Sequence, residues 1–103
     1  MRSEEIVQFL KTLKPKLEKE GIVSLGLFGS FARGEEDKDS DIDIFIETTE
    51  KFMQKYRSWD AFVYIDENIR QVIEAKFHKK VDIFDKNSNS AIKDKIMQEA
   101  CYV

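Results

Sequence analysis

The stretch GSFARGEEDKDSDIDIFIE, residues 29–47, is the part of the sequence that decides the fold. Its second half, Asp41 to Glu47, alternates between polar and apolar residues, which predicts a strand with one face in the core. Residues two apart in a strand share a face and lie roughly 7 Å apart, so Asp41 and Asp43 are expected to stand side by side. Three isoleucines are expected on the opposite face: Ile42, Ile44 and Ile46.

Two carboxylates held this close repel each other, and there are two ways to accommodate the repulsion. Both can face water, which is the commoner outcome for a lone Asp-x-Asp, or a divalent cation can neutralise them. No His or Cys stands in this stretch, so the oxygen ligands favour Mg²⁺ or Mn²⁺ over zinc. From these two residues alone, both explanations stay open.

Gly29 and Ser30 follow a β-rich run, Ile22 to Phe28, and precede a short helix expected to start at Phe31 to Arg33. Free N–H groups and a hydroxyl at such a turn can bind an anion, and glycine allows a phosphate to approach the backbone. Gly-Ser alone also caps ordinary turns. Gly-Ser followed after ten residues by Asp-x-Asp arises by chance in on the order of 10⁻³ of chains, and it predicts a site for triphosphate chemistry with metal ions.

The sequence outside this stretch predicts further helices and one more strand. A helix is expected to start at Ser3, with Pro15 either beginning a new turn or kinking it. A second long helix is marked by residues 59–73, and a third strand runs from Lys80 to Asp85. Residues 87–90 are expected to form a loop before a last helix. The apolar positions that define the first and last helices are Ile6, Leu10, Leu13 and Leu17, and Ile92, Ile96 and Met97.

Three strands interspersed with helices predict an α/β (α+β) fold, with a small mixed β-sheet flanked by helices. With 103 residues, the sequence is expected to form a single domain, residues 1–103. Its aromatic residues at positions 52–64 are expected in the core or at a partner interface rather than as a stack for adenine; they are Phe52, Tyr56, Trp59, Phe62 and Tyr64.

A two-metal site usually needs a further carboxylate, and Asp82 is the best candidate. It stands between Val81 and Ile83 in the third strand and faces opposite to them, either towards solvent or towards a site. Asp85, nearer the end of this strand, is the second choice.

Charge and composition limit the classes of function. A net charge of −3 argues against extended nucleic-acid binding, which needs many unpaired Lys and Arg residues. The single cysteine, Cys101, offers neither an internal disulfide nor a zinc pattern, which is compatible with a reducing cytoplasm. No run of about 18 apolar residues and no signal-peptide pattern is present, so we expect a cytoplasmic protein without membrane association.

The strings Gly29-Ser-Phe-Ala-Arg-Gly34 and Asp39-Ser-Asp-Ile-Asp-Ile44, with Asp82 on a later strand, resemble the signature of the minimal nucleotidyltransferases of the DNA polymerase beta superfamily. The fuller string is similar to the MntA type of that family, and the resemblance extends over nearly the whole chain. It implies a polymerase-beta-like nucleotidyltransferase fold, a mixed sheet flanked by helices.

The resemblance also implies roles for individual residues. Asp41 and Asp43 would bind two Mg²⁺ ions (or Mn²⁺), and Asp82 would bind the catalytic metal and help to activate the attacking hydroxyl. Gly29 and Ser30 would hold the triphosphate of ATP or another NTP. Arg33 matches a family position and would face phosphate, although a surface ion pair with Glu35 or Glu36 explains it equally well.

MntA-type proteins are the antitoxin partners of HEPN-domain RNases, and they transfer AMP to a tyrosine of the toxin. The resemblance thus implies a protein adenylyltransferase that acts on a HEPN toxin. A chain of 103 residues lacks a further domain to hold an acceptor, which fits an acceptor supplied by a partner. Two alternatives remain: a non-catalytic antitoxin that occludes its partner, and a nucleotidyltransferase for small molecules.

Overall fold

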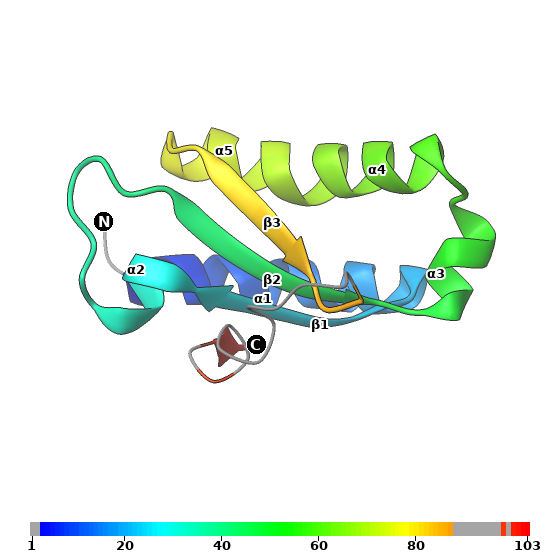
Figure 1. The fold of residues 1–103 in the computed structure, drawn as a ribbon, viewed down its shortest axis with the longest axis horizontal. Coiled ribbons are helices and arrows are strands. Elements are labelled where there is room, and N and C mark those ends of the chain that lie inside the picture. Colours follow the sequence, from blue (N-terminus) through cyan, green and yellow to red (C-terminus); the bar gives the residue numbers. More distant parts are fainter. Residues whose placement is uncertain (1–2, 88–97, 99) are drawn as a thin grey trace.

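A mixed sheet forms the centre of the computed structural model, which describes residues 3–87, 98 and 100–103. Its strands are β1 (Ile22–Phe28), β2 (Ile42–Thr48), β3 (Val81–Asp85) and β4 (Cys101–Tyr102). They are ordered β3-β2-β1-β4, with β1 antiparallel to β2 and β4, and β2 parallel to β3. The predicted mixed sheet with flanking helices is therefore confirmed, and the short β4 extends it (Figure 1).

Helices cover the sheet on the side to which the isoleucines of β2 point. Figure 1 shows α1 running behind the strands and a long helical run from α4 to α5 above them. The helix bounds are Ser3–Glu20 for α1, Gly29–Arg33 for α2, Glu50–Lys55 for α3, Trp59–Ile65 for α4, Asp66–Arg70 for the π-helical turn η1 and Gln71–Phe77 for α5.

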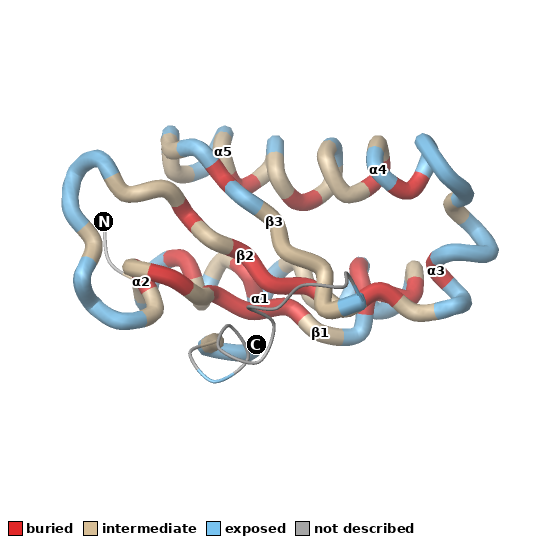
Figure 2. Tube along the Cα trace, in the orientation of Figure 1, coloured by how far each residue is buried: buried red, intermediate tan, exposed pale blue. Residues whose placement is uncertain are grey.

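One hydrophobic cluster joins these helices to the sheet. Ile42, Ile44 and Ile46 are fully buried in it, as the alternation in the sequence predicts. Helix α1 and the α4–α5 run each contribute residues from the face that is turned towards the sheet. The buried members from the helices are Ile6, Leu10, Leu17, Phe31, Phe52, Ala61, Tyr64, Ile69 and Ile73. Figure 2 shows the same division, with burial concentrated in β1, β2 and the inner sides of the helices.

Several local predictions are changed by the structure. The second strand begins at Ile42 rather than at Asp41, which lies just before it, and the third strand begins at Val81 rather than Lys80. Pro15 lies inside the continuous helix α1 and does not end it. The short helix α3 was not predicted, because its six residues bury one side chain, Phe52, and show no helical periodicity. The expected last helix with Ile92, Ile96 and Met97 lies outside the described residues.

The first turn of the second long helix exposes two of the aromatic residues that were expected in the core or at a partner interface. Trp59 and Phe62 are 70% and 57% exposed, and their rings stack on each other with centroids 4.9 Å apart. The residues that pack on the core are instead spaced by four: Ala61, Ile65, Ile69 and Ile73. The wider turn of η1 keeps this spacing aligned with the sheet, which a regular 3.6-residue period does not.

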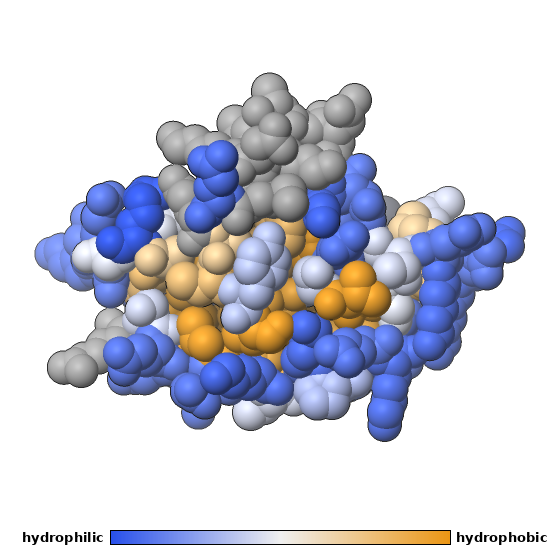
Figure 3. All heavy atoms as spheres, turned by 90° about the horizontal axis from the view of Figure 1, so that it is seen from below, coloured by the Kyte–Doolittle hydropathy of each residue, from blue (hydrophilic) through white to orange (hydrophobic). Residues whose placement is uncertain are grey.

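Hydrophobic side chains also reach the surface elsewhere. On the side seen in Figure 3, they gather in the middle and are bordered by polar residues. Val23 of β1 and Tyr102 of β4 are each nearly half exposed. Within residues 3–87, 98 and 100–103, every helix is too short or too polar to cross a lipid bilayer.

Tyr64 provides a test of the core. Its ring packs on Phe52 and Tyr56, its buried hydroxyl has no hydrogen-bond partner among the described residues, and burial raises its pKa to about 12. We expect Tyr64→Phe to raise the free energy of unfolding by about 1 kcal/mol, because it keeps the ring and removes an unsatisfied polar group. Urea unfolding measures this.

Tyr56→Phe is the matched control for that change. The Tyr56 hydroxyl donates a hydrogen bond to Glu20 Oε2 at 3.0 Å, so its removal should lower the free energy of unfolding by about 1 kcal/mol. Equal losses of unfolding free energy in the two variants would show that the Tyr64 hydroxyl is hydrogen-bonded in solution.

Candidate active site

The end of β1 places a glycine directly against a carboxylate of β2. In the antiparallel register Phe28 lies opposite Asp43, so the next residue, Gly29, meets the Asp43 side chain. Gly29 has a φ of +74°, and a Cβ atom built on it would lie 2.2 Å from Asp43 Oδ2. Both the backbone conformation and the close approach therefore require glycine at this position.

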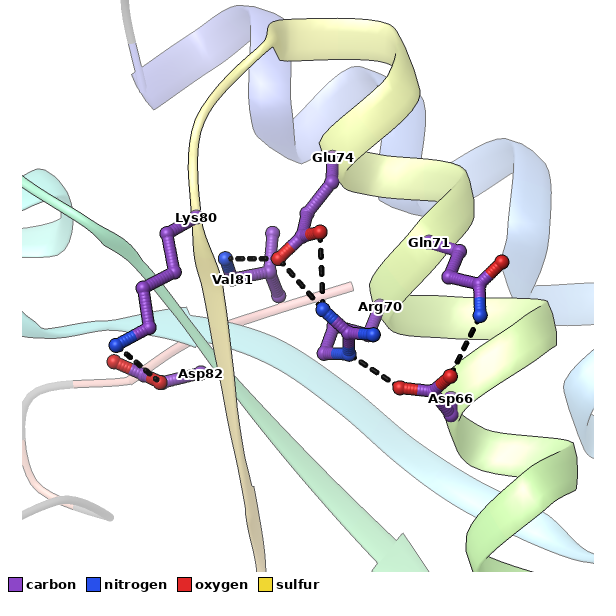
Figure 4. Close-up of polar contacts among 7 residues, drawn as sticks. All are labelled: Asp66, Arg70, Gln71, Glu74, Lys80, Val81 and Asp82. Carbon is purple, nitrogen blue, oxygen red and sulfur yellow. Dashed lines mark hydrogen bonds and ion pairs between the residues drawn. The ribbon is translucent and has the colours of Figure 1, made fainter.

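The parallel register between β2 and β3 places Asp82 beside Asp43. Val81 is buried and Asp82 is exposed, so the predicted alternation along β3 is confirmed. Lys80 Nζ lies 4.0 Å from Asp82 Oδ1, and Figure 4 shows these two side chains directed towards each other. The predicted residues thus lie at one end of the strands, where β2 and β3 begin and β1 ends.

Asp85, the second choice for a further carboxylate, lies elsewhere. It is the register partner of Ile46, three residues along β2 from Asp43, and its carboxylate accepts hydrogen bonds from Thr48 Oγ1 at 2.8 Å and from the backbone N–H of Asn87 at 3.0 Å. It therefore fixes the far end of β2 and is not brought to the cluster that contains Asp43.

The electrostatics of the cluster centre on Asp43. Burial raises the pKa of this carboxyl, the negative charges of Asp82 and Asp41 raise it further, and the positive charge of Arg33 lowers it. The half-buried Asp43 carboxylate is therefore repelled by two further carboxylates. Removing this repulsion would require either a proton on Asp43 or a cation between the carboxylates.

Arg33 and Ser30 lie on the short helix α2, which begins at Gly29 rather than at Phe31 as predicted. Arg33 Nε donates to Glu35 Oε2 at 3.1 Å, so the ion pair with Glu35 that the sequence left open is formed. The helix ends at Gly34, whose φ of +71° turns the chain away, and the Glu35 N–H donates to the Ser30 carbonyl at 2.9 Å. Arg33 therefore stands near Asp43 while it is paired with a carboxylate of its own segment.

Lys79 connects the loop before Asp41 to the strand that carries Asp82. Its Nζ donates to the carbonyls of Lys38 at 2.9 Å and Ser40 at 3.3 Å. The sequence gives no indication of this contact, because the partners of Lys79 are backbone carbonyls 41 and 39 residues away. The contact holds the residues preceding Asp41 close to the start of β3.

The donor set can be tested against a divalent cation. Among residues 3–87, 98 and 100–103, no three His, Cys, Asp or Glu side chains are already arranged as metal ligands. Asp82 is turned towards Lys80, so it would have to rotate to join the other two. The donors are nevertheless all carboxylate oxygens, and a hard cation would relieve the repulsion that raises the pKa of Asp43. The chemistry of the residues therefore fits Mg²⁺ or Mn²⁺.

Comparisons with known proteins identify a matching family model and similar sequences. The family model described as polymerase beta, nucleotidyltransferase, matches residues 11–103. The protein adenylyltransferase MntA of Thermococcus cleftensis is 33% identical over 102 residues, covering 97% of this chain and 94% of that protein. A Methanocaldococcus jannaschii protein provisionally named a protein adenylyltransferase is 34% identical over 102 residues, covering 96% and 95% of the two chains.

Two solved structures share the fold. One, provisionally described as a minimal nucleotidyltransferase, has a TM-score of 0.71 and 22% identity, covering 98% of this chain and 95% of that one. The other, described as a toxin–antitoxin with AMP-PNP, has a TM-score of 0.64 and 20% identity, covering 99% and 72%. At these identities the likeness establishes the architecture.

Gly29 and Gly34 form a matched pair for testing the contact with Asp43. Both have positive φ, but a Cβ atom on Gly34 would meet nothing within 4 Å. We expect Gly34→Ala to cost about 1 kcal/mol of unfolding free energy, and Gly29→Ala about 2 kcal/mol or more because Asp43 must move. In an Asp43→Ala background most of the excess should vanish, as a double-mutant cycle would measure. An excess of the same size in both backgrounds would contradict the contact.

The raised pKa of Asp43 predicts a pH dependence in chelator-containing buffer. A raised pKa means that the folded state binds the proton more tightly than the unfolded chain, so ionisation of Asp43 with rising pH lowers the stability. We expect Asp43→Asn to be more stable than the unsubstituted chain at pH 7, with the difference shrinking towards zero near about pH 3, where both side chains are neutral. Thermal unfolding across this range measures the difference. A variant that is less stable at pH 7 would contradict the assignment.

Proposed function

The chain belongs to the polymerase beta nucleotidyltransferase family and is an enzyme of that class, and we propose that it transfers AMP from ATP to a tyrosine hydroxyl of a HEPN-domain toxin. It would act as an antitoxin, with residues 1–103 as a single nucleotidyltransferase domain. The relatives named protein adenylyltransferase, and a structural neighbour described as a toxin–antitoxin with AMP-PNP, support this choice of acceptor and nucleotide.

One observation carries the proposal. The glycine that would lie next to the triphosphate packs against the Asp43 carboxylate, and Asp82 is the register partner of that carboxylate. A bound triphosphate and the groups that act on it would therefore meet at one point. Neither a lone Gly-Ser turn nor a lone pair of surface carboxylates requires such a contact.

We assign Asp41 and Asp43 to two Mg²⁺ ions (or Mn²⁺), and Asp82 to the catalytic ion. When bound, the ions supply charge neutralisation for the triphosphate and alignment of the attacking and leaving oxygens. The N–H groups of Gly29 and Ser30, with the Ser30 hydroxyl, contact the phosphates, and Arg33 adds positive charge beside them.

In the transfer step, the tyrosine oxygen attacks the α-phosphorus of ATP and forms a new P–O bond. The bond between the α-phosphorus and the bridging oxygen breaks, and pyrophosphate leaves with that oxygen. Asp82 accepts the proton of the tyrosine hydroxyl. Its exposed position in the structure suits contact with an incoming acceptor, whereas Asp43 is the more buried of the two.

Carboxamide substitutions test this mechanism. We expect Asp41→Asn, Asp43→Asn and Asp82→Asn each to reduce the transfer of labelled AMP to a HEPN-domain partner by about 100-fold or more, because each loses a negatively charged ligand. Transfer should also stop when EDTA is added and return with excess Mg²⁺. Gel autoradiography with α-labelled ATP measures both effects.

Asp60→Asn, on the exposed first turn of α4, is the control and should retain full transfer. Circular dichroism verifies that every variant is folded. Undiminished transfer in the three site variants would rule out the mechanism. Variants that transfer nothing but still silence the toxin would favour an antitoxin that acts by occlusion.

A further inference from the structure

A groove of about 330 Å³ lies between the β2–β3 part of the sheet and the helical run α4–η1, and Ile46 of β2 contributes to its lining. We call it the β3 groove. Ile65, Val81 and Ile83 contribute to its apolar lining, and Phe62 lies on its helical side. Asp82, which would act on the acceptor hydroxyl, also lines it. The carboxylate of Asp82 lies on the opposite face of β3 from Val81 and Ile83. A segment that follows the edge of β3 can therefore direct one side chain into the groove and the next towards Asp82.

The groove has an aromatic rim that the described residues leave uncovered. Phe62 lines the groove, and Trp59 stacks on it. At 70% and 57%, Trp59 and Phe62 are the most exposed of the large hydrophobic residues in the described part of the chain. On the same helix the aromatic side chain of Tyr64 is buried instead. Exposed aromatic residues of this kind are typical of a protein–protein contact.

Strand β3 offers its backbone to a further strand. In the described sheet it pairs on one side with β2 and forms the edge on the other. Glu74 Oε2 accepts the N–H of Val81 at 2.9 Å and so occupies the first edge position (Figure 4). By the alternation of a strand, the backbone groups of Ile83 point to the same edge and are in position to bind an extended peptide.

The charge of the groove selects the kind of occupant. Three acidic residues, Asp66, Asp82 and Asp85, and one basic residue, Arg70, line it, and Lys80 lies 4.0 Å from Asp82. Arg70 is itself held by Asp66 and by both oxygens of Glu74, the latter at 3.0 Å (Figure 4). A surplus of negative charge disfavours the triphosphate of ATP here and favours a neutral or basic segment.

We propose that the β3 groove binds an extended, basic segment of the partner protein that carries the acceptor tyrosine. The segment adds to the open edge of β3, its apolar side chains pack on Phe62 and Trp59, and its lysine or arginine residues lie near Asp66 and Glu74. Its tyrosine is directed to the opposite face of β3. The tyrosine hydroxyl then reaches Asp82. This assignment rests on the proposed function, because it takes Asp82 as the group that meets the acceptor.

Synthetic peptides test the assignment on the full chain. The probe is a ten-residue peptide with a central tyrosine flanked by leucine and lysine, and a matched peptide has glutamate in place of lysine. Trp59 is the single tryptophan of the sequence, so its fluorescence reports directly on the rim of the groove. We expect a saturable change in emission with the lysine peptide and binding at least about tenfold weaker with the glutamate peptide.

Two lysine substitutions separate the groove from the rest of the surface. Phe62→Lys removes the apolar rim and adds repulsion, whereas Met53→Lys makes the same kind of change at a residue that is 47% exposed on α3. For AMP transfer to the lysine peptide, Phe62→Lys should raise the KM for peptide about tenfold or more and leave the KM for ATP unchanged. Met53→Lys should change neither by more than about twofold.

The outcomes distinguish this inference from the function on which it rests. AMP transfer with an unchanged peptide KM in Phe62→Lys would overturn the groove and leave the proposed function intact. Saturable peptide binding that Phe62→Lys abolishes, without AMP transfer, would support the groove and count against the proposed function. Absence of any peptide binding would overturn the groove, as would a dimer in sedimentation that Phe62→Lys dissociates, since a second copy would then cover the rim.

Discussion

The rest of the site depends on how β2 is held between two neighbours of opposite direction. Its antiparallel pairing with β1 places Asp43 against the chain at Gly29, and its parallel pairing with β3 places the same residue beside Asp82. A slip of one residue in either pairing would turn the side chains of the slipped strand to the opposite face of the sheet. The hydrogen-bonded register of β2 therefore fixes the geometry of the cluster more firmly than any contact between the side chains does.

Burial of β2 offsets the repulsion that this geometry creates. Two like charges about 7 Å apart, the spacing expected for Asp41 and Asp43, repel by about 2 kcal/mol at an effective dielectric constant of about 20. Full burial of one isoleucine side chain stabilises by about 1.5–3 kcal/mol, and Ile42, Ile44 and Ile46 are all fully buried. The alternation along β2 thus serves both faces, since the apolar face anchors the strand on which the polar face presents its charges.

Alternation was also the feature that could be predicted from sequence, because strand periodicity is a local property. The periodicity predicted that the isoleucines are buried and that Asp82 faces away from Val81 and Ile83, and the order of strands and helices predicted the mixed sheet. The contact of Lys79 with the carbonyls of Lys38 and Ser40 could not be predicted, because it joins residues far apart in the chain. The sequence left open whether Trp59 and Phe62 lie in the core or at a partner interface, because hydrophobicity alone does not distinguish the two, and the structure shows both exposed.

The different burial of Asp43 and Asp82 has a consequence for how the two reactants would approach. The half-buried Asp43 lies against Gly29, on the side where a nucleotide would be held by backbone groups. Asp82 is exposed on the edge strand, where it borders a groove rimmed by unburied aromatic side chains. The nucleotide and the acceptor would then approach from opposite sides of β3 and meet at Asp82. The edge of the sheet itself would then bind the acceptor.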